Sequence, residues 1–169
     1  MRKTPRNMFL AFFVVLMGLA PFRLVHSLDS TSEFLSVKVV AEVQVRINEQ
    51  GRIITKLVPA DRVVPGDLVL YTLEVRNLGS RSLEAPTVVQ PIPVHMVYVA
   101  DSAVGPGGDI TYSVDGGLTF NRPENLSVSV SQGAARPAVA ADYTHIRWRL
   151  KSLVKADSVV FVRFRARVK

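Results

Sequence analysis

The stretch "VVPGDLVLYTLEVRNLGS", residues 63–80, decides the fold class of this 169-residue chain. A Pro65-Gly66-Asp67 corner precedes a run of alternating apolar and polar residues, and the run stops at an Asn-x-Gly sequence that begins at Asn77. Alternation with a period of two is typical of a β-strand that is buried on one face only. Asp tolerates turn geometry and Gly supplies positive φ. The stretch therefore predicts a corner, a half-buried strand and a second turn.

The same alternation precedes this stretch. Residues 36–47 carry apolar side chains at the odd positions from Val37 to Ile47, and mainly charged or polar ones between them. A turn at residues 48–51 leads into residues 52–58, which we expect to return as the hairpin partner. The first long strand of the chain is therefore predicted to be half of a β-hairpin.

The end of the chain alternates in the same way. Residues 146–150 and 160–168 each have one apolar face, and Trp148 is the expected centre of the core. Gly and Pro turns separate the strands, and residues 28–169 contain no convincing amphipathic helix. These features predict an all-β, antiparallel sandwich of about seven or eight strands, with a closed barrel as the alternative.

The middle of the chain is less regular. Pro91 and Pro93 interrupt two short apolar runs, which suits a bend or an edge because proline has no N–H for a sheet ladder. A hairpin is expected around residues 115–117, where Asp-Gly-Gly allows positive φ. Residues 121–142 are rich in Pro, Ala and Ser and predict a long loop or an irregular edge strand.

The first 27 residues have the three parts of a secretory signal: a cationic start, an apolar run at residues 8–20, and a plausible cleavage site ending at Ser27. The apolar run is short for a membrane anchor, since spanning a bilayer takes about 20 residues. We therefore predict a signal peptide over residues 1–27 and one β-domain over residues 28–169. An uncleaved N-terminal anchor is the alternative.

Charge and cysteine content restrict the chemistry. The formal net charge is +7, and removal of the predicted signal with its four cations leaves +3. The chain has no cysteine, so an exported domain would rest on packing and hydrogen bonds without disulfides. Thiolate metal sites and cysteine nucleophiles are excluded for the same reason.

Five short motifs share their order and spacing with a known family. Together they resemble the bacterial conserved-repeat domain, an immunoglobulin-like sandwich of exported proteins, over about residues 63–169. The resemblance implies a surface or envelope protein, located in the periplasm, at the cell surface or outside the cell. One position departs from the family pattern, because Gln90 stands where an acidic residue is usual. The matching motifs are Pro65-Gly66-Asp67, Tyr71-Thr72, Asn77-x-Gly79, Pro91-x-Pro93 and Tyr98-Val99.

No catalytic or metal-binding constellation is visible in the sequence. Only His95 and His145 follow the predicted signal, and no Gly-x-Ser-x-Gly or Ser-x-x-Lys motif accompanies them. The aspartates lack the spacing of calcium or zinc sites, and their Asp-Gly pairs are explained as turns. We therefore expect no enzyme activity, no cofactor, no metal and no small-molecule substrate.

The last two predicted strands carry a cationic stripe. If these strands pair with each other, their outward faces combine into one patch that suits an anionic polymer, such as lipopolysaccharide, an acidic glycan or nucleic acid. A solvated strand face that resists edge-to-edge pairing is the alternative explanation. The candidate residues are His145, Arg147, Arg149, Arg163, Arg165 and Arg167.

The sequence thus supports two hypotheses of function. The first is a non-catalytic structural or interaction module of the envelope, with a protein partner and with no membrane span once the signal is cleaved. Its long first strand, residues 36–47, is the expected site of assembly by strand addition. The second is a binding module for anionic polymers that uses the arginine stripe.

Overall fold

The computed structural model describes residues 34–130 and 133–169, so the predicted signal peptide at residues 1–27 lies outside the described residues. The all-β, antiparallel prediction is confirmed. No helix in the described part of the chain is long and apolar enough to cross a membrane. The strands are β1 (Leu35–Glu49), β2 (Arg52–Pro59), β3 (Leu68–Asn77), β4 (Thr87–Pro91), β5 (Met96–Tyr98), β6 (Asp109–Ser113), β7 (Ser127–Ser129), β8 (Ala135–Pro137), β9 (His145–Arg149) and β10 (Val159–Val168), with short 3-10 turns η1 (Pro123–Asn125) and η3 (Ala140–Asp142).

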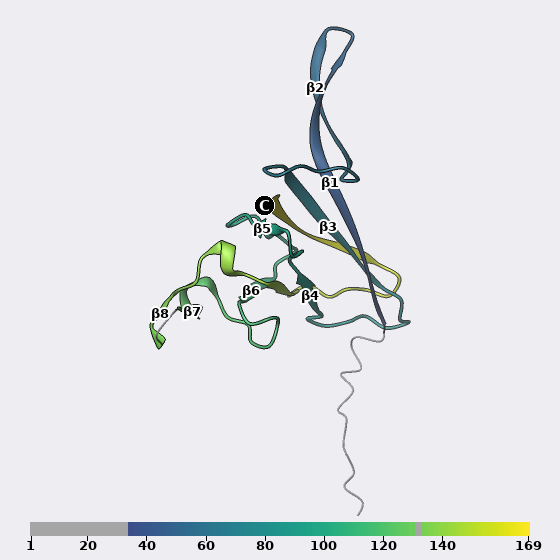
Figure 1. The fold of residues 1–169 in the computed structure, drawn as a ribbon. Helices are drawn as coiled ribbons and strands as arrows, with labels where there is room; N and C mark the ends of the chain where they lie inside the picture. Colours follow the sequence, from purple (N-terminus) through teal and green to yellow (C-terminus); the bar gives the residue numbers. More distant parts are fainter. Residues whose placement is uncertain (1–33, 131–132) are drawn as a thin grey trace, which may run out of the picture.

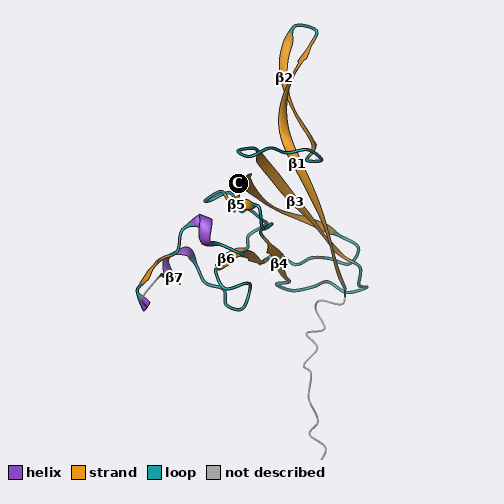
Figure 2. Ribbon diagram, in the orientation of Figure 1, coloured by secondary structure: helices purple, strands orange, loops and turns teal. Residues whose placement is uncertain are grey.

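The strands form three sheets (Figures 1 and 2). A five-stranded sheet has the order β2-β1-β3-β10-β5, and a three-stranded sheet has the order β4-β9-β6. A small ribbon of β7 and β8 lies within residues 121–142, where the sequence predicts a loop or an irregular edge. The described residues hold ten strands, whereas the sequence predicted seven or eight. Three of the ten, β5, β7 and β8, are only three residues long, which is too short for an alternating pattern to reveal.

The corner before β3 forms as predicted. Gly66 has a φ of +95°, and the Asp67 carboxylate accepts a hydrogen bond from the Val64 N–H at 2.8 Å. The Gly66 N–H donates to the Val168 carbonyl, and the Val168 N–H donates to the Asp67 carbonyl, each at 2.9 Å. The corner therefore starts β3 and also ties it to the end of β10.

The core lies between the buried faces of the two larger sheets. Trp148 of β9 is fully buried, as predicted, and its ring centroid lies 6.2 Å from that of Phe164 on β10. Phe164 in turn stacks on Tyr71 of β3 at 4.8 Å. The Trp148 indole N–H has no hydrogen-bond partner in the described structure, which costs about 1–3 kcal/mol that packing must offset.

The predicted first hairpin is confirmed, and part of it projects from the body of the molecule (Figure 1). β1 pairs with β3 only over Leu35–Val43, whereas it pairs with β2 over Glu42–Glu49. Gln50 and Gly51, with φ of +51° and +83°, make the two-residue turn between β1 and β2. The first half of β1 therefore pairs with β3 along one edge of the strand, and the second half pairs with β2 along the other edge.

The last two strands do not pair with each other, and such pairing was the condition for a continuous arginine stripe. β9 lies in the three-stranded sheet between β4 and β6, and β10 lies in the five-stranded sheet between β3 and β5. The physical reason is Val154, which is fully buried in the connection between them. Its N–H and carbonyl both bond to Leu83, at 3.0 and 2.9 Å, so the chain crosses from one sheet to the other instead of turning back.

Candidate interaction surface

The predicted arginine stripe is divided between two faces. Because Trp148 of β9 and Phe164 of β10 point into the same core, the alternate residues of these strands point outward from different sheets. The continuous six-residue patch that the sequence predicts does not form. His145, Arg147 and Arg149 lie on the outer face of the three-stranded sheet, and Arg163, Arg165 and Arg167 lie on that of the five-stranded sheet.

Within the β9 group, Arg147 is held by local contacts. The Arg147 Nε donates to the Thr111 hydroxyl at 3.1 Å, and its guanidinium lies 4.5 Å from the centre of the Phe120 ring. Arg149 lies opposite Asp109 in the register of β6 and β9. Arg147 therefore holds the loop after β6 against the sheet and is poorly placed to meet an external anion.

The β10 group is freer. Arg163, Arg165 and Arg167 are exposed at alternate positions along one strand, and only Arg167 makes a side-chain hydrogen bond among the described residues, to the Gly66 carbonyl at 2.7 Å. The registers of β1, β3 and β10 add Lys38 and Arg76 to the same outer face. Glu42 and Glu74 are the acids that these registers place there, so the face keeps an excess of positive charge.

An open strand edge lies on the first half of β1. The Phe34 carbonyl accepts from the Leu78 N–H beside β3, and the Ala41 carbonyl accepts from the Ala60 N–H on the opposite side. Because neighbouring residues of a strand direct their backbone groups to opposite sides, odd residues of β1 face away from β3. β2 begins to pair only at Glu42, so the N–H and carbonyl groups of Val37 and Val39 point to an edge that no other strand of the described residues occupies.

The side chains at this edge are also exposed. Val37 and Val39 lie opposite Val75 and Leu73 of β3, so they share the inner face of the five-stranded sheet. Val75 and Leu73 are fully buried, yet Val37 is 44% exposed and Val39 is 42% exposed. Leu35, Ala41 and Val43 of the same inner face pack against the core, so the exposed part of this face is limited to Val37 and Val39. An apolar strand edge with unpaired backbone groups is the usual template for adding another strand.

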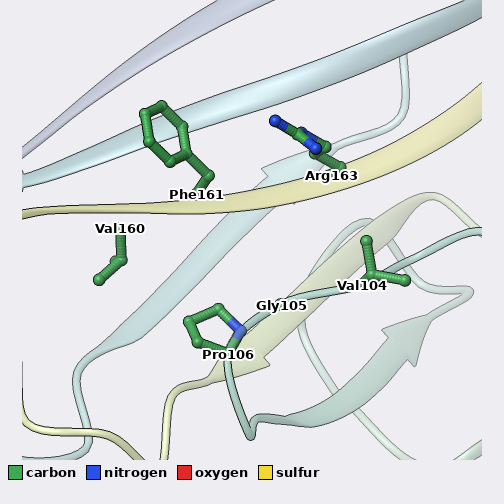
Figure 3. Close-up of a pocket in the computed structure, with 6 residues that line it drawn as sticks. All are labelled: Val104, Gly105, Pro106, Val160, Phe161 and Arg163. Carbon is green, nitrogen blue, oxygen red and sulfur yellow. The ribbon is translucent and has the colours of Figure 1, made fainter.

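A second, shorter open edge lies beside β10, at a groove of about 500 Å³. Val104 exchanges two 2.9 Å hydrogen bonds with Arg163, after which the chain leaves β10 at Pro106. By the same alternation, the backbone groups of Phe161 point into the groove. Figure 3 shows Pro106 across the groove from Val160 and Phe161. The lining residues are Val104, Gly105, Pro106, Val160, Phe161 and Arg163.

Asp115 has structural partners. The Asp115 carboxylate accepts from the Ser113 and Thr119 hydroxyls, both at 2.6 Å, and these hydrogen bonds lower the pKa of Asp115 below its usual range. Among the described residues, neither His95 nor His145 bonds to a carboxylate, and no three His, Cys, Asp or Glu side chains gather as metal ligands would. Asp115 is thus explained by the Asp-Gly-Gly turn that the sequence predicts.

Three tyrosines form a closed aromatic cluster beside the core. The Tyr98 hydroxyl accepts from the Ala103 N–H at 3.0 Å and lies 2.9 Å from the Tyr112 hydroxyl. Tyr112 stacks on Tyr143 with ring centroids 4.5 Å apart. Burial, followed by the hydrogen bond to Tyr98, raises the pKa of Tyr112 far above its usual range. These contacts hold the segments of Ala103 and Tyr143 against β5 and β6.

Comparison with known proteins does not distinguish between a protein partner and an anionic polymer as the ligand of this chain. No family model matches the chain. No curated protein and no solved structure matches it either. The resemblance to the conserved-repeat domain therefore stays a prediction from the motifs. The functional argument rests on the open strand edges and on the arginines of β10.

The sequence predicted β1 as the strand for assembly, a role that stays a prediction, but it did not predict which part of the strand has an open edge. The alternating pattern of residues 36–47 predicts one buried face along the whole strand. In the structure, Val37 and Val39 are exposed while Leu35, Ala41 and Val43 pack against the core, and local alternation carries no signal for that difference. The groove beside β10 was missed as well, because it arises where residues 104–106 meet a strand more than fifty positions later.

Proposed function

We propose that this protein is a non-catalytic, exported interaction module, folded as an immunoglobulin-like β-sandwich, that binds a protein partner of the bacterial envelope by strand addition. Export and the envelope rest on the signal-like residues 1–27 and on the motif resemblance. The packing of Trp148 against Phe164 across two antiparallel sheets supports a sandwich over a closed barrel.

One observation carries the proposal: the open edge of β1 at Val37 and Val39, where exposed apolar side chains accompany backbone groups that no strand of the described ranges 34–130 and 133–169 pairs with. Proteins that do not use such an edge normally block it with a charge, a proline or a covering loop. Lys38 is the charged residue between the two valines, but it lies on the outer face beside Glu74. Within the described part of the chain, the inner face of Leu35–Val39 carries Leu35, Val37 and Val39 and no charged residue or proline.

The test compares two substitutions at one position. Val39→Pro removes the N–H that points to the open edge and leaves the hydrogen bonds of β1 to β3 in place, whereas Val39→Ala trims the side chain but keeps the N–H. Each purified protein is immobilised and exposed to an envelope extract. We expect Val39→Ala to retain a partner that wild type captures and Val39→Pro to lose it. Equal capture by both variants would refute binding by strand addition.

One observation supports a second function, which is the binding of anionic polymers. Arg163 and Arg165 stay together on the outer face of the five-stranded sheet, away from the β9 arginines. If this face binds anions, wild-type retention on heparin falls as salt increases, since screening weakens the attraction. Arg165→Glu should then lose retention, while Arg149→Glu, an equal charge change on the other sheet, should keep it. Equal losses would indicate only a net-charge effect.

A further inference from the structure

We infer that the partner at the open edge of β1 is a second copy of this chain, paired antiparallel about a two-fold axis at Val37. This inference rests on the proposed function, because it names the partner of the same edge. The stretch concerned is Leu35–Val39, which β3 covers on one side only. Pairing two copies there joins their five-stranded sheets into one continuous sheet.

The available backbone groups fix the register. Only odd residues of β1 direct N–H and carbonyl groups to the open edge, so an antiparallel copy must pair odd residues with odd residues. With the axis at Val37, Val37 faces Val37 of the second copy and Leu35 faces its Val39. A register centred at Val39 would need Ala41, whose carbonyl already accepts from Ala60 at 3.0 Å.

The side chains favour the same register. An axis at Val37 keeps the inner faces of both copies on one side of the joined sheet, because paired residues of an antiparallel sheet point the same way. The exposed valines of the two copies then cover one another. On the outer face, Lys38 lies opposite Ser36 of the second copy. An axis at Lys38 would instead place two lysines directly opposite each other, which is destabilising.

Self-pairing also fits the shape of the hairpin. In an antiparallel arrangement, the second copy's β1 runs away from the first copy's β2, so the two projecting hairpins extend in opposite directions. β2 covers the edge of β1 from Glu42 onward, which limits the contact to the short stretch at Leu35–Val39. We therefore expect a reversible dimer rather than an obligate one.

The chain has no cysteine, so single cysteines report the register directly. Opposed residues of a hydrogen-bonded pair have Cα atoms about 5.5 Å apart, within the range of a disulfide. Two residues at position 39 would be about 13 Å apart in this register, which a disulfide cannot span. Under mild oxidation of the cell-processed protein, Val37→Cys should therefore form a linked dimer, while Val39→Cys should stay unlinked.

Sedimentation equilibrium of the cysteine-free protein supplies the second measurement. Wild type and Val39→Ala should show a monomer–dimer equilibrium, and Val39→Pro should weaken it by about tenfold or more, because two symmetric hydrogen bonds are lost. A strictly monomeric wild type, or cross-linking of Val39→Cys as efficient as that of Val37→Cys, would overturn the inference. If wild type is monomeric but Val39→Pro alone loses the envelope partner, the proposed function survives and only the second copy is excluded.

Discussion

At the scale of single residues, Asn77 shows how one side chain ends a strand and closes a loop. It is fully buried, and its amide nitrogen donates to the carbonyls of Arg81 at 2.7 Å and Val154 at 3.0 Å. Its side-chain oxygen accepts from the Gly79 N–H at 2.9 Å. The Asn-x-Gly motif is therefore a brace between the end of β3 and the chain crossing at Val154.

We predict that Asn77→Ala lowers the free energy of unfolding by about 2–4 kcal/mol, because it removes three hydrogen bonds made by a fully buried side chain. Asn48→Ala is the matched control, since Asn48 is exposed and accepts one hydrogen bond from Gly51 at 2.9 Å. Its effect should stay below about 1 kcal/mol. Urea unfolding measures the stability of both variants. A smaller loss of stability for Asn77→Ala than for Asn48→Ala would show that Asn77 does not hold the end of β3 to the chain crossing at Val154.

Asp142 gives the stability a defined response to acid. Its carboxylate accepts from the Arg136 guanidinium at 2.6 and 2.7 Å and from the Val139 N–H at 2.8 Å, which lowers the pKa of Asp142 from 3.8 to about 2. A carboxyl with a lower pKa in the folded state stabilises the fold above its unfolded pKa. That stabilisation is lost as pH falls from about 4 to about 2.

We therefore predict that the stability of Asp142→Asn is closest to that of wild type near pH 2, and that the difference grows up to about pH 4 and then stays level. Chemical denaturation at several pH values measures this difference. Subtracting the two curves removes the contribution of Asp115, which both proteins share. A difference that does not change between pH 2 and pH 4 would show that the pairing with Arg136 does not stabilise the fold.

At the scale of elements, the segment beside β10 depends on a glycine. A Cβ on Gly105 would lie 2.9 Å from Cγ1 of Val162 and 3.2 Å from Cδ1 of Trp148, and both of these side chains are fully buried. The neighbouring Val104 pairs with Arg163 and is itself exposed. Gly105 thus allows the segment to approach β10 closely enough to form the lower wall of the groove in Figure 3.

Gly105→Ala should cost about 1–3 kcal/mol of stability, the usual penalty for overpacking a core. Val104→Ala, which trims an exposed side chain next to it, should change stability by about 0.5 kcal/mol or less. Thermal unfolding compares the two variants. Equal transition temperatures for Gly105→Ala and wild type would mean that the segment can move away from Val162 without cost.

The elements also show which features were predictable from sequence. β1, β3, β9 and β10 were recognised because alternation with a period of two is a local property of a strand. Their order in the sheets was not, because it depends on Val154 pairing with Leu83 about seventy positions earlier. The same non-local contact separated the arginines of β9 from those of β10. The candidate edge was predictable as a strand, but its openness depends on where β2 begins to pair with β1, at Glu42.

At the scale of the whole molecule, the body and the projecting hairpin tip have different roles. Residues 44–57 of β1 and β2 pair with each other and not with β3. Ile53 at the tip is 75% exposed, whereas the core is formed by β3, β9 and β10 with their neighbours. An isolated two-stranded ribbon is marginally stable, so the tip should add little to the stability of the fold.

A shortened chain tests this division. Replacing residues 46–55 by Asn-Gly joins Val45 to Lys56, a pair whose backbone groups face each other and suit a two-residue turn. We expect the free energy of unfolding to change by about 1 kcal/mol or less, since mainly exposed residues are removed. We also expect the dimer equilibrium at Leu35–Val39 to stay unchanged. A large loss of stability would place the tip in the folding unit, and a lost dimer would move the self-association from the open edge of β1 to the tip.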